Sequence, residues 1–330
     1  MPIYDNHNRP ITYLRLAVTD RCNLRCFYCM PENGVQYLPK KEILSFEEME
    51  RLVRLVAPLG IHKLRITGGE PFVRKELMPF LARLAAIPGI DAIHLTTNGV
   101  LTAPHVPALK ALGIRSVNLS IDSLDEARFF EITRRNELKR VLKTLDALLE
   151  VQIPTKLNVV VMADKNDQDI LPMVALTKDL PLEVRFIEEM PFNGEGQKQA
   201  ALPWDYQRII AHIRAHYPSL QKIADEPFST AYHYAIDGHQ GKIGVIAAFS
   251  RTFCGTCNRI RLTAQGTLET CLYDEGVLNI RDWMRQGASD EQLTEMLLKA
   301  FSNRPKDGFE AEAKRDLLNP VHESMSAIGG

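Results

Sequence analysis

Residues 14–30 read LRLAVTDRCNLRCFYCM, an apolar run followed at once by three closely spaced cysteines. The run at 14–19 has the character of a buried strand, and Cys22, Cys26 and Cys29 follow it with the spacing C-x3-C-x2-C. Loops that leave strand ends are where rigid scaffolds present their chemistry. Three thiolates suit a soft metal or an iron–sulfur cluster and leave one coordination position open, as catalytic sites do. The alternative is three buried or paired thiols.

The same pattern of an apolar strand followed by a helix recurs through the first part of the chain. Further strands are expected at 63–67, 92–97, 116–122, 155–162 and 182–188, with helices between them. Ser45 and Glu48 form the signature of a capping box at the start of the first helix. Six such units predict parallel strands buried on both faces, in an α/β partial (βα)6 TIM-like barrel. A flat doubly wound sheet is the structural alternative.

A change of organisation is marked by the polar stretch NGEGQKQA at 193–200. We therefore expect a barrel domain over residues 1–192 and a smaller C-terminal α+β domain over 193–330, with short strands and turns from about residue 225. In both forms of an α/β sheet, ligands bind at the carboxyl ends of the strands. The cysteine loop and the turns GGEP (68–71), TTNG (96–99), SID (120–122) and EEMPF (188–192) all fall there.

The remaining three cysteines, Cys254, Cys257 and Cys271, form a second triplet in the C-terminal part. A structural zinc site wants four ligands, so zinc would need a histidine such as His233 or His239 to complete it. A cluster iron left open for substrate explains the missing ligand better. Arg259 and Arg261 follow the second of these cysteines and share one face of a predicted strand, which suits an anion site. A solvated strand face is the plainer alternative.

Composition excludes several classes of function. The chain has 330 residues, 45% of them hydrophobic and 25% charged, as in an ordinary globular protein. Its net charge of −1 argues against broad nucleic-acid or anionic-membrane binding, and no apolar run reaches the ~18 residues of a membrane span. The first residues, MPIYDNHNRPITY, lack the apolar core of a signal peptide. We therefore expect a cytoplasmic protein, in which reduced thiols favour metal chemistry over disulfides.

Basic residues recur on the predicted strands. Arg15, Arg65 and Lys156 each stand in an otherwise apolar strand, where a charge is costly unless it is paired or given to a ligand. Each alone is more often a paired structural residue. Together with Arg259 and Arg261 they point to a polyanionic substrate.

CNLRCFYC, with Tyr28 before the last cysteine, resembles the cluster motif of the radical S-adenosylmethionine (SAM) superfamily, and GGEP at 68–71 resembles its second motif. This likeness implies a [4Fe–4S] cluster whose open iron binds the amine and carboxylate of SAM. It also implies that a reduced cluster generates a 5′-deoxyadenosyl radical, which takes a hydrogen atom from a substrate. The superfamily's full or partial (βα) barrel agrees with the six units above.

Within that superfamily the chain resembles the GTP 3′,8-cyclase family of molybdenum-cofactor (molybdopterin) biosynthesis over nearly its whole length. The likeness is carried by LRLAVTDRCNLRCFYC, KLRITGGEPFVRK, LTTNG, NLSIDSL, KLNVVVM, VRFIEEMPF, FCGTCNRIRLTAQGTLETCLY and the terminal Gly329-Gly330. It implies two [4Fe–4S] clusters, one on Cys22, Cys26 and Cys29 and one on Cys254, Cys257 and Cys271. It implies SAM along Tyr28, Gly69, Ser120 and Met190, and GTP along Arg15, Arg65, Thr96, Lys156, Arg259, Ile260 and Arg261. Catalytic roles would fall to Arg15, Gly329 and Gly330.

The family's reaction takes hydrogen from ribose C3′ of GTP and joins that carbon to guanine C8. The product, (8S)-3′,8-cyclo-7,8-dihydroguanosine 5′-triphosphate, would pass to a cyclic pyranopterin monophosphate synthase. A reducing electron donor is implied, and a homodimer is possible. One alternative is a radical SAM maturase that modifies a peptide with an auxiliary cluster. Another is a non-enzymatic iron–sulfur or zinc module for electron transfer, although electron transfer favours fully ligated clusters.

Overall fold

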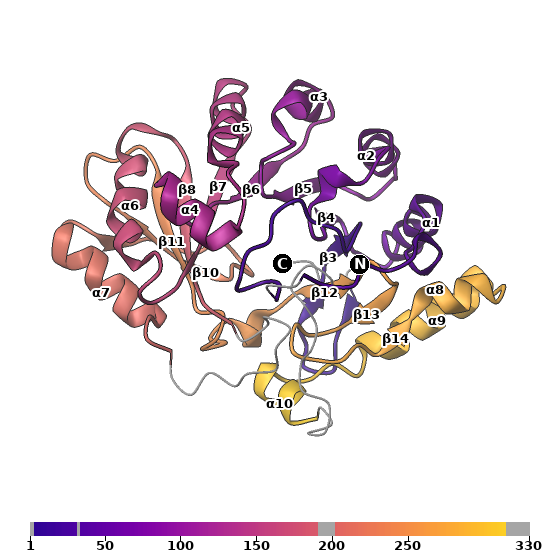
Figure 1. The fold of residues 1–330 in the computed structure, drawn as a ribbon. Helices are drawn as coiled ribbons and strands as arrows, with labels where there is room; N and C mark the ends of the chain where they lie inside the picture. Colours follow the sequence, from indigo (N-terminus) through magenta and orange to yellow (C-terminus); the bar gives the residue numbers. More distant parts are fainter. Residues whose placement is uncertain (1–2, 32–33, 191–201, 315–330) are drawn as a thin grey trace.

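The structure is a computed structural model that describes residues 3–31, 34–190 and 202–314. Six parallel strands from the first part of the chain line its centre, and helices cover their outer face (Figure 1). The strands are β3 (Tyr13–Ala17), β4 (Lys63–Thr67), β5 (Ala92–Thr97), β6 (Ser116–Ser120), β7 (Thr155–Val161) and β8 (Glu183–Glu188). The helices are α1 (Phe46–Val56), α2 (Leu77–Ala85), α3 (Val106–Ala111), α4 (Glu126–Thr133), α5 (Leu138–Glu150) and α6 (Ile170–Asp179). The predicted partial barrel is confirmed.

Strands from the C-terminal part extend this sheet at both of its edges. These later elements are α7 (Tyr206–His216), β9 (Gln221–Lys222), β10 (Ala231–Ala235), β11 (Lys242–Ile246), β12 (Arg259–Leu262), β13 (Thr267–Glu269), β14 (Leu278–Asn279), α8 (Ile280–Arg285), α9 (Asp290–Phe301) and α10 (Gly308–Ala313). The sheet order in the described residues is β14-β13-β12-β3-β4-β5-β6-β7-β8-β11-β10-β9. Both β12 beside β3 and β11 beside β8 run parallel to their neighbours. The predicted division at residue 192 stays a prediction.

The remaining elements are short. A small hairpin joins β1 (Ile3–Tyr4) to β2 (Pro10–Ile11). Single 3₁₀ turns occur at η1 (Lys40–Glu42), η2 (Pro71–Val73), η3 (Ala103–His105), η4 (Asp167–Asp169) and η5 (Cys254–Thr256). A turn at Gln265-Gly266 connects β12 to β13 as an antiparallel hairpin, with Gly266 at a φ of 89°. No helix in the described ranges combines the length and apolar character needed to cross a membrane.

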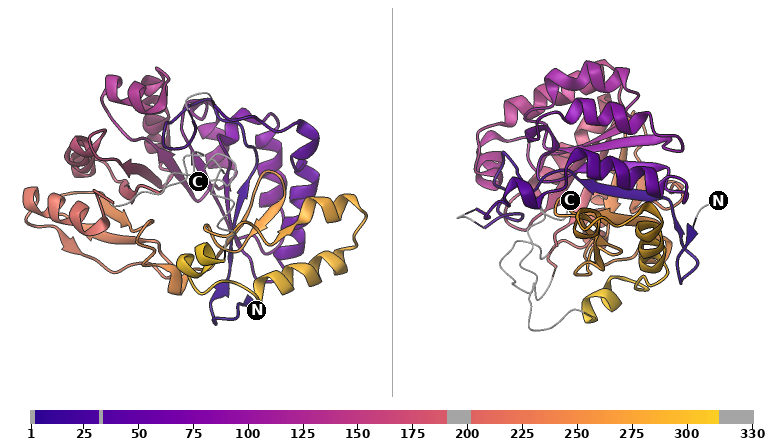
Figure 2. Two further views of the ribbon diagram at one scale, coloured as in Figure 1. Left: turned by 60° about the horizontal axis from the view of Figure 1, so that its bottom comes forward. Right: turned by 90° about the vertical axis from the view of Figure 1, so that its right-hand side faces the viewer.

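The apolar core lies between the sheet and its outer helices, in two clusters. The first surrounds β3, β4 and β5 and includes buried residues of α1, α2, α8 and α9. The second surrounds β7 and β8 and includes α5, α6 and α7. Figure 2 shows α8 and α9 beside α1, where Arg51 and Asp290 pair at 2.6 Å. Each cluster therefore joins early and late segments of the chain, and burial of its large side chains contributes about 1.5–3 kcal/mol each.

The first helix begins as its sequence predicts. The Ser45 hydroxyl accepts from the backbone N–H of Glu48 (3.1 Å), and the Ser45 N–H donates to the Glu48 carboxylate (2.7 Å). This capping box satisfies two of the free donors at the helix start.

Candidate active site

The first cysteine triplet lies on the loop that leaves the carboxyl end of β3. This loop packs against the end of α4, where the Arg25 N–H donates to the carbonyl of Thr133 (3.0 Å) and the Phe27 N–H to that of Ile132 (3.1 Å). The loop is therefore anchored by backbone hydrogen bonds on one side. On its other side the loop contacts the turn that follows β4.

The glycines after β4 fit directly against the cysteine loop. A Cβ on Gly69 would lie 2.3 Å from the carbonyl oxygen of Arg21, and one on Gly68 would lie 2.5 Å from that of Thr19. Hydrogen bonds from the Gly69 N–H to Thr19 and from the Glu70 N–H to Arg21, both 2.8 Å, close this contact. Glycine is required here because the two turns meet backbone to backbone. The second motif therefore contacts the loop of the first motif through its glycines.

Glu70 links the GGEP and TTNG turns from a fully buried position. Its carboxylate accepts from the N–H of Asn98 (2.7 Å), the hydroxyl of Thr97 (2.8 Å) and the N–H of Phe72 (3.1 Å). Burial raises the pKa of Glu70 to about 7, although these hydrogen bonds favour the ionised form. The Asn98 side chain donates in turn to Cys22 Sγ at 3.6 Å. The GGEP and TTNG turns thus brace the cysteine loop.

Tyr28 and Asp122 meet inside the barrel. The Tyr28 hydroxyl donates to Asp122 Oδ2 (2.8 Å), and the Val160 N–H donates to Oδ1 (2.9 Å). Burial raises the pKa of Asp122 to about 6. This contact connects the cysteine loop to β6 and β7.

The thiols of the first triplet suit a cationic cluster. Burial raises the pKa of Cys22 to about 12 and that of Cys26 well above its ordinary value. A thiolate at these positions needs a strong positive partner, which iron supplies. Within the described ranges no group of three or more His, Cys, Asp or Glu side chains is arranged to hold a single metal ion. Three thiolates on one loop are a donor set that iron–sulfur clusters take.

The second triplet is held by buried arginines from both ends of the described chain. Arg9 donates to the carbonyl of Cys254 (3.0 Å), and Arg304 donates to the carbonyls of Cys257 (3.1 Å) and Thr270 (3.1 Å). Both arginines pair with the buried carboxylate of Asp5, at 2.7 and 3.1 Å. Three distant segments are therefore fixed by one charged cluster, which sequence spacing could not reveal.

The electrostatics of the second triplet differ from those of the first. Burial would raise the pKa of Cys257, but the nearby charges of Arg259 and Arg304 lower it to about 7. Burial raises the pKa of Cys271 to about 12. The thiol closest to the arginines therefore ionises most readily.

Neither candidate histidine completes this triplet as a zinc site. His233 is buried with its two ring nitrogens 3.1 Å from Glu183 Oε1 and 3.0 Å from Asp225 Oδ1. His239 Nδ1 lies 2.8 Å from the Thr177 hydroxyl. Both lie outside the cavity lining to which the cysteines belong. The zinc alternative loses its proposed fourth ligand.

One cavity of about 910 Å³ joins the two triplets, and all six cysteines line it. Tyr28, Gly69, Ser120 and Met190 line the same cavity. Gly329 and Gly330 lie outside the described residues. The side-chain oxygens of Asn118 and Asn158 are buried in this wall without a hydrogen-bond partner in the described residues. Unsatisfied acceptors beside a large cavity fit a polar ligand.

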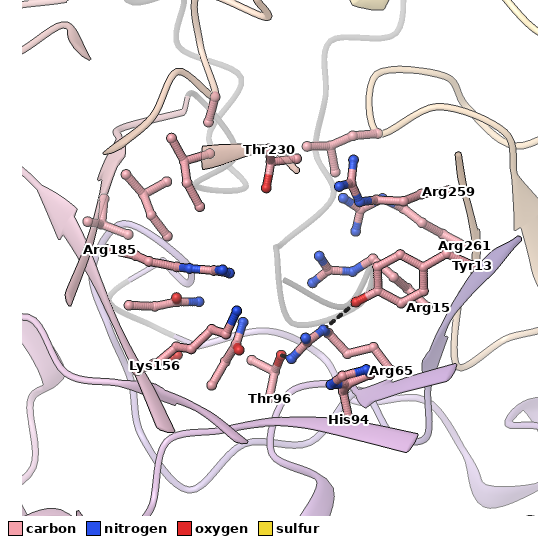
Figure 3. Close-up of a pocket in the computed structure, with 18 of the residues that line it drawn as sticks. Tyr13, Arg15, Arg65, His94, Thr96, Lys156, Arg185, Thr230, Arg259 and Arg261 are labelled. Atoms are coloured by element: carbon pink, nitrogen blue, oxygen red, sulfur yellow. Dashed lines mark hydrogen bonds between the residues drawn. The ribbon is translucent and has the colours of Figure 1, made fainter. Parts of the chain in front are cut away.

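Cations gather on the wall of this cavity because parallel register aligns them. Arg261, Arg15, Arg65 and His94 are successive register partners across β12, β3, β4 and β5. In Figure 3, Arg185 and Lys156 point into the cavity from one side and Arg259 and Arg261 from the other. Burial, and then the charge of Arg261, hold the pKa of Arg15 well below its ordinary range. A bound polyanion would relieve this crowding of positive charge.

The positive charges of the wall also lower the pKa values of Tyr13 and His94, which line the same cavity. The Tyr13 hydroxyl accepts from Arg65 Nε (2.5 Å); burial opposes its ionisation, but the charges of Arg65 and Arg15 lower its pKa to about 7. Burial and neighbouring cations lower the pKa of His94 to about 2, so the ring is neutral. Its Nδ1 lies 2.7 Å from the Ser116 hydroxyl.

The sequence expectations for this wall are met unevenly. Arg15, Arg65, Thr96, Lys156, Arg259 and Arg261 all line the cavity. The side chain of Ile260 instead lies in the first apolar cluster, because alternate residues of β12 face opposite ways. Sequence reasoning missed further lining residues, namely Tyr13, Lys63, His94, Asn118, Asn158, Arg185 and Arg304. The first five stand two residues from an expected site residue on the same strand, so the period of two could have found them.

Two family models match this chain, and several named proteins are similar to it over most of its length. The Radical SAM superfamily model matches residues 16–177, and the Molybdenum Cofactor Synthesis C model matches residues 182–310. The GTP 3′,8-cyclase of Syntrophomonas wolfei is 43% identical over 95% of this chain and 98% of its own. The mitochondrial GTP 3′,8-cyclase of Arabidopsis thaliana is 40% identical over 99% of this chain and 83% of its own.

Longer relatives and solved structures agree with this. Molybdenum cofactor biosynthesis protein 1 of Mus musculus is 40% identical over 92% of this chain, which spans about half (48%) of that relative's length. The crystal structure of Streptococcus suis SuiB matches with a TM-score of 0.62 over 94% of this chain and 70% of SuiB. At 14% identity that likeness concerns the fold alone.

Proposed function

The chain belongs to the GTP 3′,8-cyclase family, and we propose that it catalyses the first step of molybdenum-cofactor biosynthesis. The reaction converts GTP into (8S)-3′,8-cyclo-7,8-dihydroguanosine 5′-triphosphate. One observation carries the proposal: two open cysteine triplets line a single cavity whose wall is crowded with cations. Fold likeness alone would not identify a reaction, whereas this combination of donors fits few others.

The two triplets would hold one [4Fe–4S] cluster each. Cys22, Cys26 and Cys29 belong to the cluster that takes SAM, with Tyr28, Gly69, Ser120 and Met190 beside it. When bound, this cluster and SAM supply a carbon-centred radical that can remove a hydrogen atom. Cys254, Cys257 and Cys271 would carry the second cluster, close to the substrate. The chain's own part is to orient these groups and to keep water from them.

The cations of the wall bind the triphosphate. Arg65 and Lys156 lie on barrel strands, and Arg259 and Arg261 lie on the added strand β12. The phosphates would therefore contact cations on both sides of the cavity. Thr96 adds a hydroxyl at the end of β5. Arg15, central in its row and strongly influenced by Arg261, is the candidate catalytic cation. Roles for Gly329 and Gly330, and for Ile260 through its backbone, stay predictions.

The atom balance of the reaction requires an electron and a proton from outside GTP. The product is an isomer of GTP, so the hydrogen that leaves C3′ must be replaced by an electron and a proton. A reducing electron donor therefore has to serve the protein. We propose a cytoplasmic enzyme whose product passes to a cyclic pyranopterin monophosphate synthase.

The reaction is tested by anaerobic incubation of the reconstituted protein with SAM, a reductant and GTP. Mass analysis should find 5′-deoxyadenosine together with an isomer of GTP. A peptide-modifying maturase would form 5′-deoxyadenosine without consuming GTP, and that result would reject the proposal. Iron and sulfide content separates the non-enzymatic alternative, because one cluster plus zinc contradicts two open clusters.

The anion site is tested by replacing Arg259 and Arg261 together with glutamine. Charge-assisted hydrogen bonds contribute about 1.5–3 kcal/mol each, so GTP affinity should fall by about two to four orders of magnitude. Isothermal titration calorimetry measures the change. The matched control is Arg54→Gln, an exposed arginine that pairs with Glu50 on α1. Equal affinities in the double variant and the control would rule out the site.

A further inference from the structure

Glu183 is a buried carboxylate that contacts two cations of the basic cavity, Lys156 and Arg185. This first residue of β8 is 3% exposed, and it does not itself line the cavity. Its Oε1 accepts from Arg185 Nε (2.5 Å) and faces His233 Nε2 (3.1 Å). Its Oε2 lies 3.3 Å from Lys156 Nζ and 3.7 Å from Lys242 Nζ. Burial opposes its ionisation, but His233, Arg185 and Lys156 hold the pKa of Glu183 well below its ordinary value.

The register of three strands builds this arrangement. Glu183 stands opposite Lys156 on β7 and opposite Lys242 on β11. Two residues along each strand, Gly244 on β11 stands between Arg185 on β8 and His233 on β10. A Cβ on Gly244 would lie 3.0 Å from Glu183 Oε1 and 3.1 Å from Arg185 Cγ. The missing side chain leaves the space through which the His233 ring reaches across β11.

Each ring nitrogen of His233 faces a carboxylate oxygen. Nδ1 lies 3.0 Å from Asp225 Oδ1, and Nε2 lies 3.1 Å from Glu183 Oε1. Ionised carboxylates only accept hydrogen bonds, so a ring nitrogen that carries a proton donates to the carboxylate it faces. A chain of close polar contacts therefore runs from Asp225 through His233 to Glu183, and on to Lys156 and Arg185 at the cavity.

We propose that Glu183 is the resident counter-anion of the substrate cavity, a positioning residue that acts through Lys156 and Arg185. Before substrate arrives it balances these two cations and orients the Arg185 fork. The phosphates of the substrate then compete with Glu183 for Lys156, and the His233–Asp225 pair weakens the carboxylate's hold so that the exchange is possible. This inference rests on the proposed function in one respect, that the cavity takes a triphosphate.

Two substitutions should move anion affinity in opposite directions. Glu183→Gln keeps an oxygen that accepts from Arg185 but removes the competing charge, so polyphosphate should bind more tightly. His233→Gln takes the ring nitrogen away from Glu183 Oε1, so the carboxylate is freer to hold Lys156 and Arg185 and polyphosphate should bind more weakly. For one charge or one charge-assisted hydrogen bond at such distances in a partly buried site, we expect changes of about three- to tenfold in each direction.

The experiment is calorimetric titration of the anaerobically reconstituted protein with inorganic tripolyphosphate, and with guanosine as a ligand that has no phosphate. The control is Asp169→Asn, which removes an equally buried carboxylate that pairs with Arg128 outside the cavity. Tripolyphosphate affinity should change in both test variants and stay at the wild-type value in the control. Guanosine affinity should change in none. Unchanged or weaker tripolyphosphate binding by Glu183→Gln, or equal shifts for guanosine, would overturn the inference.

A double variant guards against misfolding. Glu183→Gln with His233→Gln replaces both partners of the contact together by amides, so neither is left facing the group that its own substitution has removed. In this background the His233 change should have a much smaller effect than in the wild type, because its target is gone; an equal effect in both backgrounds contradicts the coupling. Failure of wild-type protein to bind tripolyphosphate would instead reject the anion site of the proposed function.

Discussion

The two cysteine triplets are held in place by different means. Backbone contacts hold the first: the glycine turn after β4 presses against it, and Glu70 gathers the neighbouring turns. Side chains hold the second: Arg9 and Arg304 bridge its segments around Asp5. A motif formed by one short loop can be braced by the next turn in the sheet. A motif whose members are scattered needs long side chains that reach across.

The largest effect should come from Gly69→Ala. Its new Cβ would lie 2.3 Å from the backbone oxygen of Arg21, and neither turn can move without breaking the bonds between them. We expect the first cluster to be lost and the second retained, so anaerobic iron and sulfide contents should fall by half.

Gly255→Ala is the matched control inside the second triplet. A Cβ at Gly255 meets nothing within 4 Å, so iron content should not change. Full iron content in Gly69→Ala would show that the glycine turn does not brace the first triplet.

Arg304→Gln should have the next largest effect, on the second triplet. Breaking a buried ion pair costs about 3–5 kcal/mol, and this arginine also binds the backbone next to two of the cysteines. Iron should again fall by half, but SAM cleavage should persist because the first triplet is untouched. Arg128→Gln, which breaks the pair with Asp169, is the control. Loss of SAM cleavage with full iron content would contradict a role confined to the second triplet.

The smallest effect should come from His94, which lies on strand β5 of the barrel. Its pKa is about 2 in the folded protein against an ordinary value of 6.5, so below pH 6.5 the unfolded chain binds a proton that the folded one does not. Folding stability is then lost as the pH falls, by about 1.4 kcal/mol for each pH unit below 6.5. His94→Gln should remove this part of the acid sensitivity. Urea unfolding at pH 7.0 and 5.5 measures it, and identical pH slopes in both proteins would contradict a neutral buried His94.

The barrel strands and the first triplet could be predicted from sequence more easily than the contacts around the second triplet, for a physical reason. The capping box at Ser45, the six strands and the first triplet depend on residues close in sequence, so local spacing reveals them. Arg304 was missed because nothing near it in sequence marks its targets, whereas Arg185 stands inside the expected strand at 182–188, where the argument used for Arg15 and Lys156 also applies. The strands β11 and β12 were expected as short strands in turns, yet both join the barrel in parallel, since long connections allow such crossovers.

By itself the sequence determined the chemistry that is available: two incomplete sets of thiolates, a glycine turn and basic residues on several separate strands. Only the tertiary structure decided that these parts share one cavity and that Glu183 and His233 stand behind the cations. The reason is that spacing along one strand fixes which face a residue takes. Register between strands, which depends on packing of the whole sheet, decides which charges meet.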